Sequence, residues 1–374
     1  MSEAPQPAHP SWIEVDLGQF RRNVGLIRSF IGPTRFCLPV KANAYGHGLR
    51  AMGLAAEAAG LDYLGVAHLQ EGVQLREAGV TLPILVLGAI HADQIPDFIR
   101  YDLEVSVSSR FKADLVASAC ERLGRVCRVH LEVDTGMQRT GVRPGTAVEL
   151  FAHLRDLPCV EVVGIYSHLA TADLPGDPFA LAQIAAFEAL LRDPVFAGVP
   201  LLRHLCNSGG TAHFPQAHYD MVRPSIMVFG YPPEQAPGAL QGLAPCFSLK
   251  SKVSYFKVVE AGQGISYGHT YVTSRRTRIV TVPVGYGDGY RRALSNRAEV
   301  LIRGRRFPIV GTICMDQLMV DVGDAEVRVG DEVVLIGRQG AEEIPLVEIA
   351  RLCGTIPYEI LCQFNGRIPR VYVG

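Results

Sequence analysis

Lys41 is the residue of this chain whose surroundings best suit covalent chemistry. It follows the apolar run 36–40 and opens the glycine-bearing string KANAYGHG. An ammonium group that emerges from a buried strand into such a loop is partly desolvated, which lowers its pKa and suits it to Schiff-base formation. A lysine at a strand end can equally extend along apolar surface and keep its charge in water. Position alone gives these two interpretations similar weight.

Polar and charged side chains also follow two later apolar runs. Glu132, Asp134 and Arg139 come at the end of one run, and His168 comes at the end of the next. Each of them alone is better explained by a structural ion pair or a hydrogen-bonded histidine. Together they favour a functional site.

Small hydroxyl and glycine residues follow two further runs. The string NSGG contains Asn207 and Ser208, and the string RPSI contains Arg223, Ser225 and Ile226. Such residues let backbone N–H groups approach an anion, although serine and glycine are also common in ordinary turns. A phosphate site opposite a strand-end lysine is what pyridoxal phosphate requires, because its aldehyde needs an amine and its phosphate an anchor.

The apolar runs that precede these residues alternate with helix-like stretches up to about Gly230. Near-continuous apolar runs, each followed by a crossover helix, indicate a buried parallel sheet. Eight of them predict an α/β fold, a (β/α)8 barrel of the TIM type with its active site at the carboxyl ends of the strands. An open doubly wound sheet stays possible. The predicted strands are 36–40, 63–67, 84–87, 103–107, 126–133, 160–167, 201–206 and 219–222.

Beyond a proline-rich stretch the pattern changes to short alternating segments between glycine-rich turns. This pattern is typical of a mainly antiparallel β domain. We place the boundary near Gly242, which gives a barrel domain over 12–242 and a C-terminal β domain over 243–374. A strand expected at 12–15 can pack with the second domain. The β segments expected there are 250–259, 278–284, 299–302, 319–322 and 332–336, with one helix at 346–352.

The composition argues against several classes of protein. With 374 residues, 48% of them hydrophobic and 20% charged, the chain can bury a large core and is not disordered. A net charge of −1 with scattered signs offers no basic face to nucleic acid. The longest apolar stretch is far short of the roughly 20 residues of a membrane span, and no signal peptide is recognised. Nine irregularly spaced cysteines fit neither a disulfide framework nor a metal site, so we expect a cytoplasmic protein without a metal.

Four strings along the chain resemble the alanine racemase family. They are VKANAYGHG, SYG, CMD and PYEILCQFNGRIPRVY, and the likeness covers nearly the whole chain. It implies a homodimer whose active sites are completed by the partner subunit, with pyridoxal 5'-phosphate as cofactor. The implied reaction interconverts L- and D-alanine. It supplies D-alanine, which is a building block of peptidoglycan. Whether the product enters cell-wall synthesis or catabolism stays open.

The resemblance also implies individual roles. Lys41 would hold the cofactor in Schiff-base linkage and exchange the proton on one face of the substrate α-carbon, and the partner subunit's Tyr267 would serve the opposite face. Arg223, oriented by His204, would hydrogen-bond the pyridine nitrogen and so discourage transamination. His168 would hydrogen-bond that tyrosine. The other implied residues bind the cofactor (Tyr45, Asn207, Ser208, Ser225, Ile226, Tyr358), bind the substrate carboxylate (Arg139, Met315) or support these groups (Glu132, Asp316).

Two positions depart from the family pattern. Glu132 stands where many members have a carbamylated lysine, and we expect its carboxylate to orient Arg139 without modification, so that bicarbonate has no effect on activity. Thr312 stands where many relatives have an arginine at the substrate entryway, which predicts different electrostatics there.

Three alternatives to an alanine racemase follow from the same residues. The bulk of Tyr358 favours a methyl side chain, but a serine or broad-specificity racemase of the same family is the nearest alternative. A non-catalytic pyridoxal-phosphate-binding regulatory protein would consist of the barrel alone, so the β domain with Tyr267 and Met315 argues against it. An amino-acid decarboxylase usually needs a carboxylate at the pyridine nitrogen, and Arg223 argues against that.

Overall fold

The structure is a computed structural model that describes residues 9–374. Residues 1–8, which carry part of the argument against a signal peptide, lie outside the described residues. The described chain forms two compact units. The barrel unit comprises Phe20–Ala44 and Gly48–Ala244, and the β unit comprises the described residues up to Gln19 together with Tyr45–His47 and Pro245–Gly374.

Eight parallel strands close into a barrel in the first unit. They are β2 (Arg35–Pro39), β3 (Tyr63–Val66), β4 (Ile84–Val86), β5 (Glu104–Val107), β6 (Cys127–Glu132), β7 (Val160–Tyr166), β8 (Leu202–His204) and β9 (Met221–Val222). The ring closes where β2 pairs with β9, with Arg35 opposite Met221. Most of these strands are buried along their length, because helices cover the outside and side chains fill the inside. The predicted barrel is therefore confirmed, and the open sheet is excluded.

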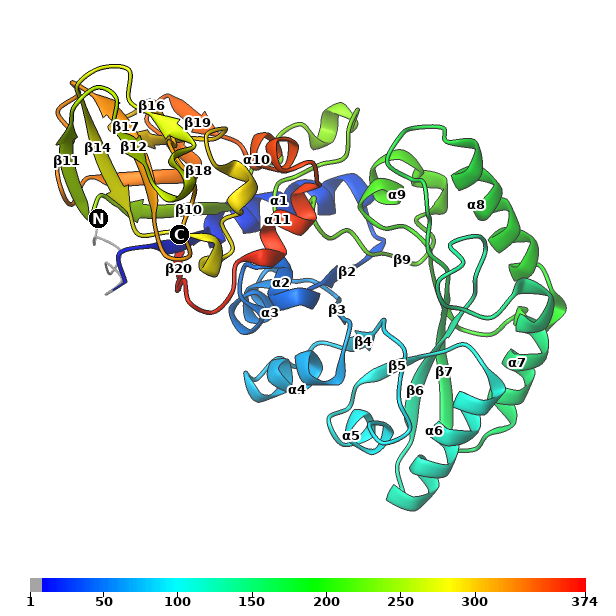
Figure 1. Ribbon diagram of the computed structural model, residues 1–374. Coiled ribbons are helices and arrows are strands. Elements are labelled where there is room, and N and C mark those ends of the chain that lie inside the picture. The colour runs from blue at the N-terminus through cyan, green and yellow to red at the C-terminus, as the bar shows by residue number, and fades with distance from the viewer. Residues whose placement is uncertain (1–8) are drawn as a thin grey trace. The chain divides into compact units, whose positions relative to one another are not determined.

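Helices follow the barrel strands in the order that a right-handed βα repeat requires. They are α2 (Lys41–Tyr45), α3 (Leu49–Ala58), α4 (Leu69–Glu77), α5 (Ile95–Arg100), α6 (Arg110–Leu123), α7 (Pro144–Asp156), α8 (Pro178–Leu191) and α9 (Ser208–His213). Figure 1 shows α6, α7 and α8 along the outer side of β6 and β7. The helices thus shield the outer face of the strands from water. The loops at the carboxyl end of the barrel stay available for functional residues.

The helix expected after the first strand is α1 (Leu17–Ile31). Its start is capped by Asp16, whose carboxylate accepts from the backbone N–H of Gln19 at 2.7 Å. Phe20 and other residues at helical spacing are buried on one face, as the sequence pattern predicts. Within the barrel unit, the Asn23 amide donates to the carbonyls of Val228 and Ala244, at 3.0 and 2.8 Å. These bonds fix the helix against the segment that leaves β9.

The β unit consists mainly of antiparallel strands. They are β1 (Trp12–Asp16), β10 (Phe247–Lys252), β11 (Tyr255–Val259), β12 (Gly264–Ile265), β13 (Tyr271–Val272), β14 (Thr277–Val282), β15 (Glu299–Ile302), β16 (Arg305–Pro308), β17 (Leu318–Gly323), β18 (Glu332–Gln339), β19 (Glu342–Ile344) and β20 (Arg370–Val373). A seven-stranded sheet has the order β16-β15-β18-β10-β1-β20, with β19 paired to β18. The strands β11-β14-β17 form a second sheet and β12-β13 a third. The helices of this unit are α10 (Leu346–Cys353) and α11 (Pro357–Gln363).

The structure differs from the sequence expectation in two places of the β unit. The single segment expected at 250–259 is two strands in different sheets, β10 and β11, because the chain turns at Val253 and Ser254. The helix α11 was not expected beside α10. It is only seven residues long and begins with Pro357, so its pattern is too short to stand out.

No helix among residues 9–374 is long and apolar enough to cross a membrane. All nine cysteines lie in the described part of the chain and are free thiols.

Candidate active site

Lys41 begins a short left-handed turn directly after β2. Ala42, Asn43 and Ala44 have φ angles of 53°, 56° and 52°. Left-handed backbone costs about 1–2 kcal/mol for each residue that has a Cβ, so other contacts must hold this turn. One such contact is the Asn43 side-chain oxygen, which accepts from the backbone N–H of Leu49 at 2.8 Å.

Glu71 of α4 joins this turn to the next βα loop. One carboxylate oxygen accepts from the N–H of Ala42 at 2.7 Å. The other accepts from the N–H of Ala67 at 2.8 Å and of His68 at 3.3 Å. The loops that follow β2 and β3 are therefore bound to one carboxylate, and backbone hydrogen bonds fix the position of Lys41.

His168 is surrounded by positive charge. Burial, together with the nearby charges of Arg223, Arg139 and Lys41, lowers its pKa to about 3. His168 is therefore uncharged at neutral pH. The barrel unit thus gathers three predicted site cations, from the loops after β2 and β6 and from the end of β9, around one neutral imidazole.

Arg223 is held firmly in the barrel interior, where it is 3% exposed. One terminal nitrogen donates to Nδ1 of His204 at 2.7 Å. The other donates to the carbonyls of Ser167 and Leu205, at 2.9 and 3.3 Å, and lies 3.2 Å from Nδ1 of His168. Burial lowers the pKa of Arg223 from its ordinary value, but a guanidinium still stays protonated in a protein. The orientation of this charge is fixed by at least three acceptors.

Two serines from neighbouring βα loops lie side by side. The Ser208 hydroxyl accepts from the N–H of Ser225 at 2.9 Å, and the two hydroxyl oxygens are 3.4 Å apart. Asn207 caps α9, with its side-chain oxygen accepting from the N–H of Gly210 at 2.9 Å. Ile226, which directly follows Ser225, is buried. The predicted phosphate-binding residues of strands β8 and β9 are thus brought together.

Glu132 lies at the end of β6 and is 9% exposed. Its carboxylate accepts from the Thr140 hydroxyl at 2.6 Å. Burial raises its pKa, and the charge of Arg139 acts in the opposite direction. Among the described residues no ion pair within 4.0 Å joins Glu132 to Arg139, so the attraction acts over a longer distance than we expected. Asp134 instead stabilises its own turn, by accepting from the N–H of Gly136 at 2.9 Å.

Tyr267 lies at the tip of a tight turn in the β unit and is 72% exposed. Ser266 and Gly268 on either side of it have φ angles of 63° and 72°. Thr312 holds this turn, because its hydroxyl donates to the carbonyl of Tyr267 at 2.9 Å while its own carbonyl accepts from the Ser266 hydroxyl at 2.6 Å. Thr312 is 4% exposed, so the residue that holds this turn is itself buried.

Met315 is presented by a loop whose backbone rests on the string GYGDGY. The N–H of Gly287 donates to the Met315 carbonyl at 2.8 Å, and a Cβ on Gly285 would lie 2.2 Å from that same oxygen. Asp316, the next residue, forms an ion pair with Arg367 at 2.6 Å. The glycines of this string, to which composition gave no role, allow the close approach that positions Met315.

Tyr45 and Tyr358 lie close together in the β unit, with ring centroids 5.9 Å apart. A Cβ on Gly46, which has a φ of 81°, would lie 2.2 Å from the carbonyl oxygen of Leu361 in α11. Glycine is therefore required for this part of the string KANAYGHG to approach α11.

Sequence reasoning missed three polar residues that hydrogen bonds connect to this site, namely Glu71, Glu104 and His130. Glu71 was hidden in a helix pattern, and Glu104 and His130 were hidden in strands. Both strand residues are polar side chains inside apolar runs, and this was the signal that could have found them.

Comparisons with known proteins match both parts of the chain. The family descriptions "Alanine racemase, N-terminal domain" and "Alanine racemase, C-terminal domain" match residues 15–233 and 246–372. The chain is 50% identical to the alanine racemase of Symbiobacterium thermophilum over 98% of this chain and 97% of that protein. It is 41% identical to that of Desulfovibrio desulfuricans over 97% and 98%.

Solved structures give the same result. The alanine racemase of Clostridium difficile 630 superposes with a TM-score of 0.94 at 36% identity, covering 98% of this chain and 97% of that one. The alanine racemase of Streptomyces lavendulae gives a TM-score of 0.93 at 37% identity, with 99% and 98% covered. Since both domains match over nearly their full length, the chain belongs to the alanine racemase family.

Proposed function

We propose that this protein interconverts L- and D-alanine with pyridoxal phosphate as cofactor, as a cytoplasmic homodimer. One observation carries the proposal. Lys41, Arg139 and Arg223 gather around the uncharged imidazole of His168 at the carboxyl end of the barrel. Three cations at one barrel mouth call for anionic ligands, and a phosphate-bearing cofactor and an amino-acid carboxylate are two such anions.

The residues present fit pyridoxal phosphate by their chemistry. Lys41 supplies the amine, and Arg223 supplies a donor for the pyridine nitrogen that has its other N–H groups already engaged. The phosphate would be held by Ser208, Ser225 and their neighbours. The full set proposed to hold the cofactor is Lys41, Tyr45, His168, His204, Asn207, Ser208, Arg223, Ser225, Ile226 and Tyr358.

The bound cofactor would stabilise negative charge at the substrate α-carbon. Arg223 does not give up its proton, so it leaves the pyridine nitrogen unprotonated and limits how far that charge is withdrawn. Because the charge stays largely on the α-carbon, the proton is more readily returned to that carbon. The family is pyridoxal-phosphate-dependent, which agrees with this donor set.

Racemisation requires an acid/base group on each face of the planar carbon. We assign one face to the Lys41 amine and the other to the phenol of the partner subunit's Tyr267. Arg139 and the partner subunit's Met315 would hold the substrate carboxylate, with Glu132 and Asp316 in support. Tyr267 and Met315 are 72% and 52% exposed in the single chain, which suits residues that serve a neighbouring subunit.

The first test measures proton exchange in two variants. Lys41→Ala should abolish racemisation, and Tyr267→Phe should abolish exchange of the α-proton of one alanine enantiomer while the other still exchanges. Deuterium uptake from heavy water, followed by NMR, gives both rates. Equal, mild effects of the two substitutions would contradict the two-base assignment.

A second test asks whether the active site is shared between subunits. When Lys41→Ala and Tyr267→Phe chains are mixed and allowed to exchange, each mixed dimer regains one intact site if the tyrosine comes from the partner. Random exchange should then restore about a quarter of wild-type activity. A mixture that stays inactive although mixed dimers form would contradict the shared site, and a monomeric mass by light scattering would contradict the dimer.

The substrate and the cofactor have separate readouts. We expect a higher kcat/KM for alanine than for serine, because Tyr358 leaves room for only a small side chain. Protein that stays colourless and unreactive to borohydride after pyridoxal phosphate is added would overturn the cofactor assignment.

We also propose that the chain divides at about Gly242 into a barrel domain over 12–242 and a β domain over 243–374. Limited proteolysis can test this boundary.

A further inference from the structure

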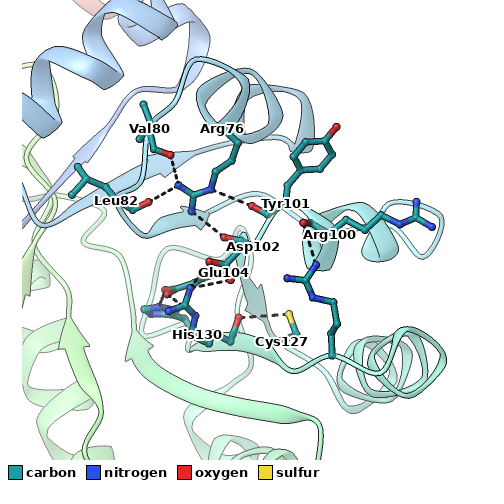
Figure 2. Close-up of polar contacts among 11 residues, drawn as sticks. Arg76, Val80, Leu82, Arg100, Tyr101, Asp102, Glu104, Cys127 and His130 are labelled. Atoms are coloured by element: carbon teal, nitrogen blue, oxygen red, sulfur yellow. Dashed lines mark hydrogen bonds and ion pairs between the residues drawn. The ribbon is translucent and has the colours of Figure 1, made fainter.

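A chain of polar side chains runs through the barrel interior to Arg223. Oε2 of Glu104, on β5, lies 2.8 Å from Nε2 of His130 on β6 (Figure 2). Nδ1 of His130 lies 3.0 Å from Nε2 of His204 on β8, and Nδ1 of His204 lies 2.7 Å from Arg223. All four side chains are at most 3% exposed. This series, which we call the relay, occupies a place where barrels usually pack apolar side chains.

The hydrogen bonds of the relay all point the same way, with each group donating to the next from Arg223 to Glu104. A guanidinium has only donors, so Nδ1 of His204 must accept and carries no proton. The remaining proton of a neutral His204 is then on Nε2, which donates to Nδ1 of His130. By the same argument His130 carries its proton on Nε2 and donates it to Glu104, whose carboxylate only accepts. Burial lowers the pKa of His204 well below its ordinary value, which agrees with a neutral ring.

Packing leaves the two rings little freedom to turn. Tyr166 stacks on His204 with 4.8 Å between centroids and 8° between planes. A Cβ on Gly164, opposite His130 on β7, would lie 2.2 Å from Nδ1 of that ring. A bare α-carbon is therefore what lets His130 occupy the barrel interior.

The relay also gives the buried charge of Arg223 a remote partner. Among residues 9–374 no carboxylate lies within 4.0 Å of the Arg223 guanidinium. Glu104, the carboxylate at the other end, is held 3.4 Å from Arg128, which also pairs with Asp102 at 3.0 Å. Arg76 donates to the carbonyl of Asp102 at 3.0 Å, so the backbone that leads into Glu104 is fixed as well (Figure 2).

We propose that Glu104 and His130 are positioning residues, which lock His204 in the tautomer that accepts from Arg223 and so hold the guanidinium toward the cofactor. They touch neither substrate nor cofactor. A carboxylate behind a histidine fixes the tautomer of the ring and makes its other nitrogen a better acceptor, as in metal sites where the ligand is a histidine. The consequence for catalysis rests on the proposed function, but the tautomers do not.

The first experiment reads the tautomers directly. Full-length protein labelled with 15N-histidine is measured by NMR near neutral pH, before and after pyridoxal phosphate is added. We expect His130 and His204 each to show a protonated Nε2 and a bare Nδ1 in both samples. A proton on Nδ1 of either ring overturns the proposal.

The second experiment removes the carboxylate charge. In Glu104→Gln the new amide can donate to His130 as well as accept, so the 15N shifts of both rings should move toward a mixture of tautomers. The kcat for alanine should fall about tenfold, the lower end of what such supporting residues contribute, while KM changes less. The control is Asp102→Asn, which alters the exposed carboxylate on the same Arg128 and should leave shifts and kcat unchanged. Unchanged shifts and kcat in Glu104→Gln overturn the proposal.

A third variant guards against a folding defect in Glu104→Gln. Gly164→Ala adds one methyl group against His130 and changes no polar group, so it should disturb the same resonances and lower kcat while PLP still binds. Normal His204 shifts in this variant would overturn the proposal. If the wild-type tautomers are as expected but the protein does not racemise alanine, the proposed function fails and the relay stands.

Discussion

Replacing Glu71 by glutamine should loosen the turn that carries Lys41. Both carboxylate oxygens accept backbone N–H groups, one from Ala42 at 2.7 Å and the other from Ala67 and His68. Glutamine has one side-chain oxygen, so its NH2 group must face an N–H donor on one side. Either the left-handed turn or the start of α4 then loses its acceptor.

The size of the effect follows from these contacts. The four left-handed residues that follow Lys41, from Ala42 to Tyr45, cost about 4–8 kcal/mol in total, which surrounding hydrogen bonds must offset. A hydrogen bond to a charged group contributes about 1.5–3 kcal/mol. Since the N–H of Ala42 is exposed, we take the lower end and expect Glu71→Gln to reduce the free energy of unfolding by about 1.5 kcal/mol.

Urea unfolding and a cofactor titration check this expectation. We expect a lower midpoint and weaker binding of pyridoxal phosphate, because the amine that binds it is no longer held in place. The matched control is Glu77→Gln on the same helix, whose exposed pair with Arg50 should contribute less than about 0.5 kcal/mol. If Glu71→Gln behaves like Glu77→Gln in both measurements, the turn is held by other contacts and the reasoning is refuted.

Three further predictions concern other parts of the site. Thr312→Val should lower kcat severalfold because the turn of Tyr267 loses its hydroxyl donor, whereas Thr312→Ser should keep the rate; equal rates would contradict this. Added bicarbonate should leave the activity unchanged, because Glu132 already provides a carboxylate; clear activation would show that this charge is insufficient. The pKa of His168 is about 3 when folded and 6.5 when unfolded, so the unfolded chain binds more protons between these values. Stability should therefore fall by up to about 1.4 kcal/mol per pH unit on acidification through this window, and His168→Asn should reduce that slope in urea unfolding.

The barrel could be predicted from sequence because its physics is simple. A strand buried on both faces is mostly apolar, so all eight runs were visible, even one as short as Met221–Val222. The β unit was harder, since strands of two to four residues such as β12, β13 and β16 carry too few side chains for an alternating pattern. Pairing between β1 and β20, from opposite ends of the chain, depends on tertiary contacts that no local pattern records.

The residues of the site also differ in how well the sequence predicts them. Lys41, Ser208 and Arg223 were expected after strand ends, where barrel chemistry lies, and in the structure they come after β2, β8 and β9. Glu104 and His130 lie within strands, and their partners are separated from them by 26 and 74 residues along the chain. Spacing in sequence carries no signal for contacts of that kind. A polar residue inside an otherwise apolar run is the one local sign of them.

The missing side chain at Gly164 has an evolutionary consequence. His130 occupies the space that a Cβ on this glycine would need, so neither position can change freely alone. A relative that replaces the histidine by a smaller apolar residue gains room for alanine on the neighbouring strand, and one that keeps the histidine does not. The two positions should therefore vary together in the history of the family, although neither is expected to touch the substrate.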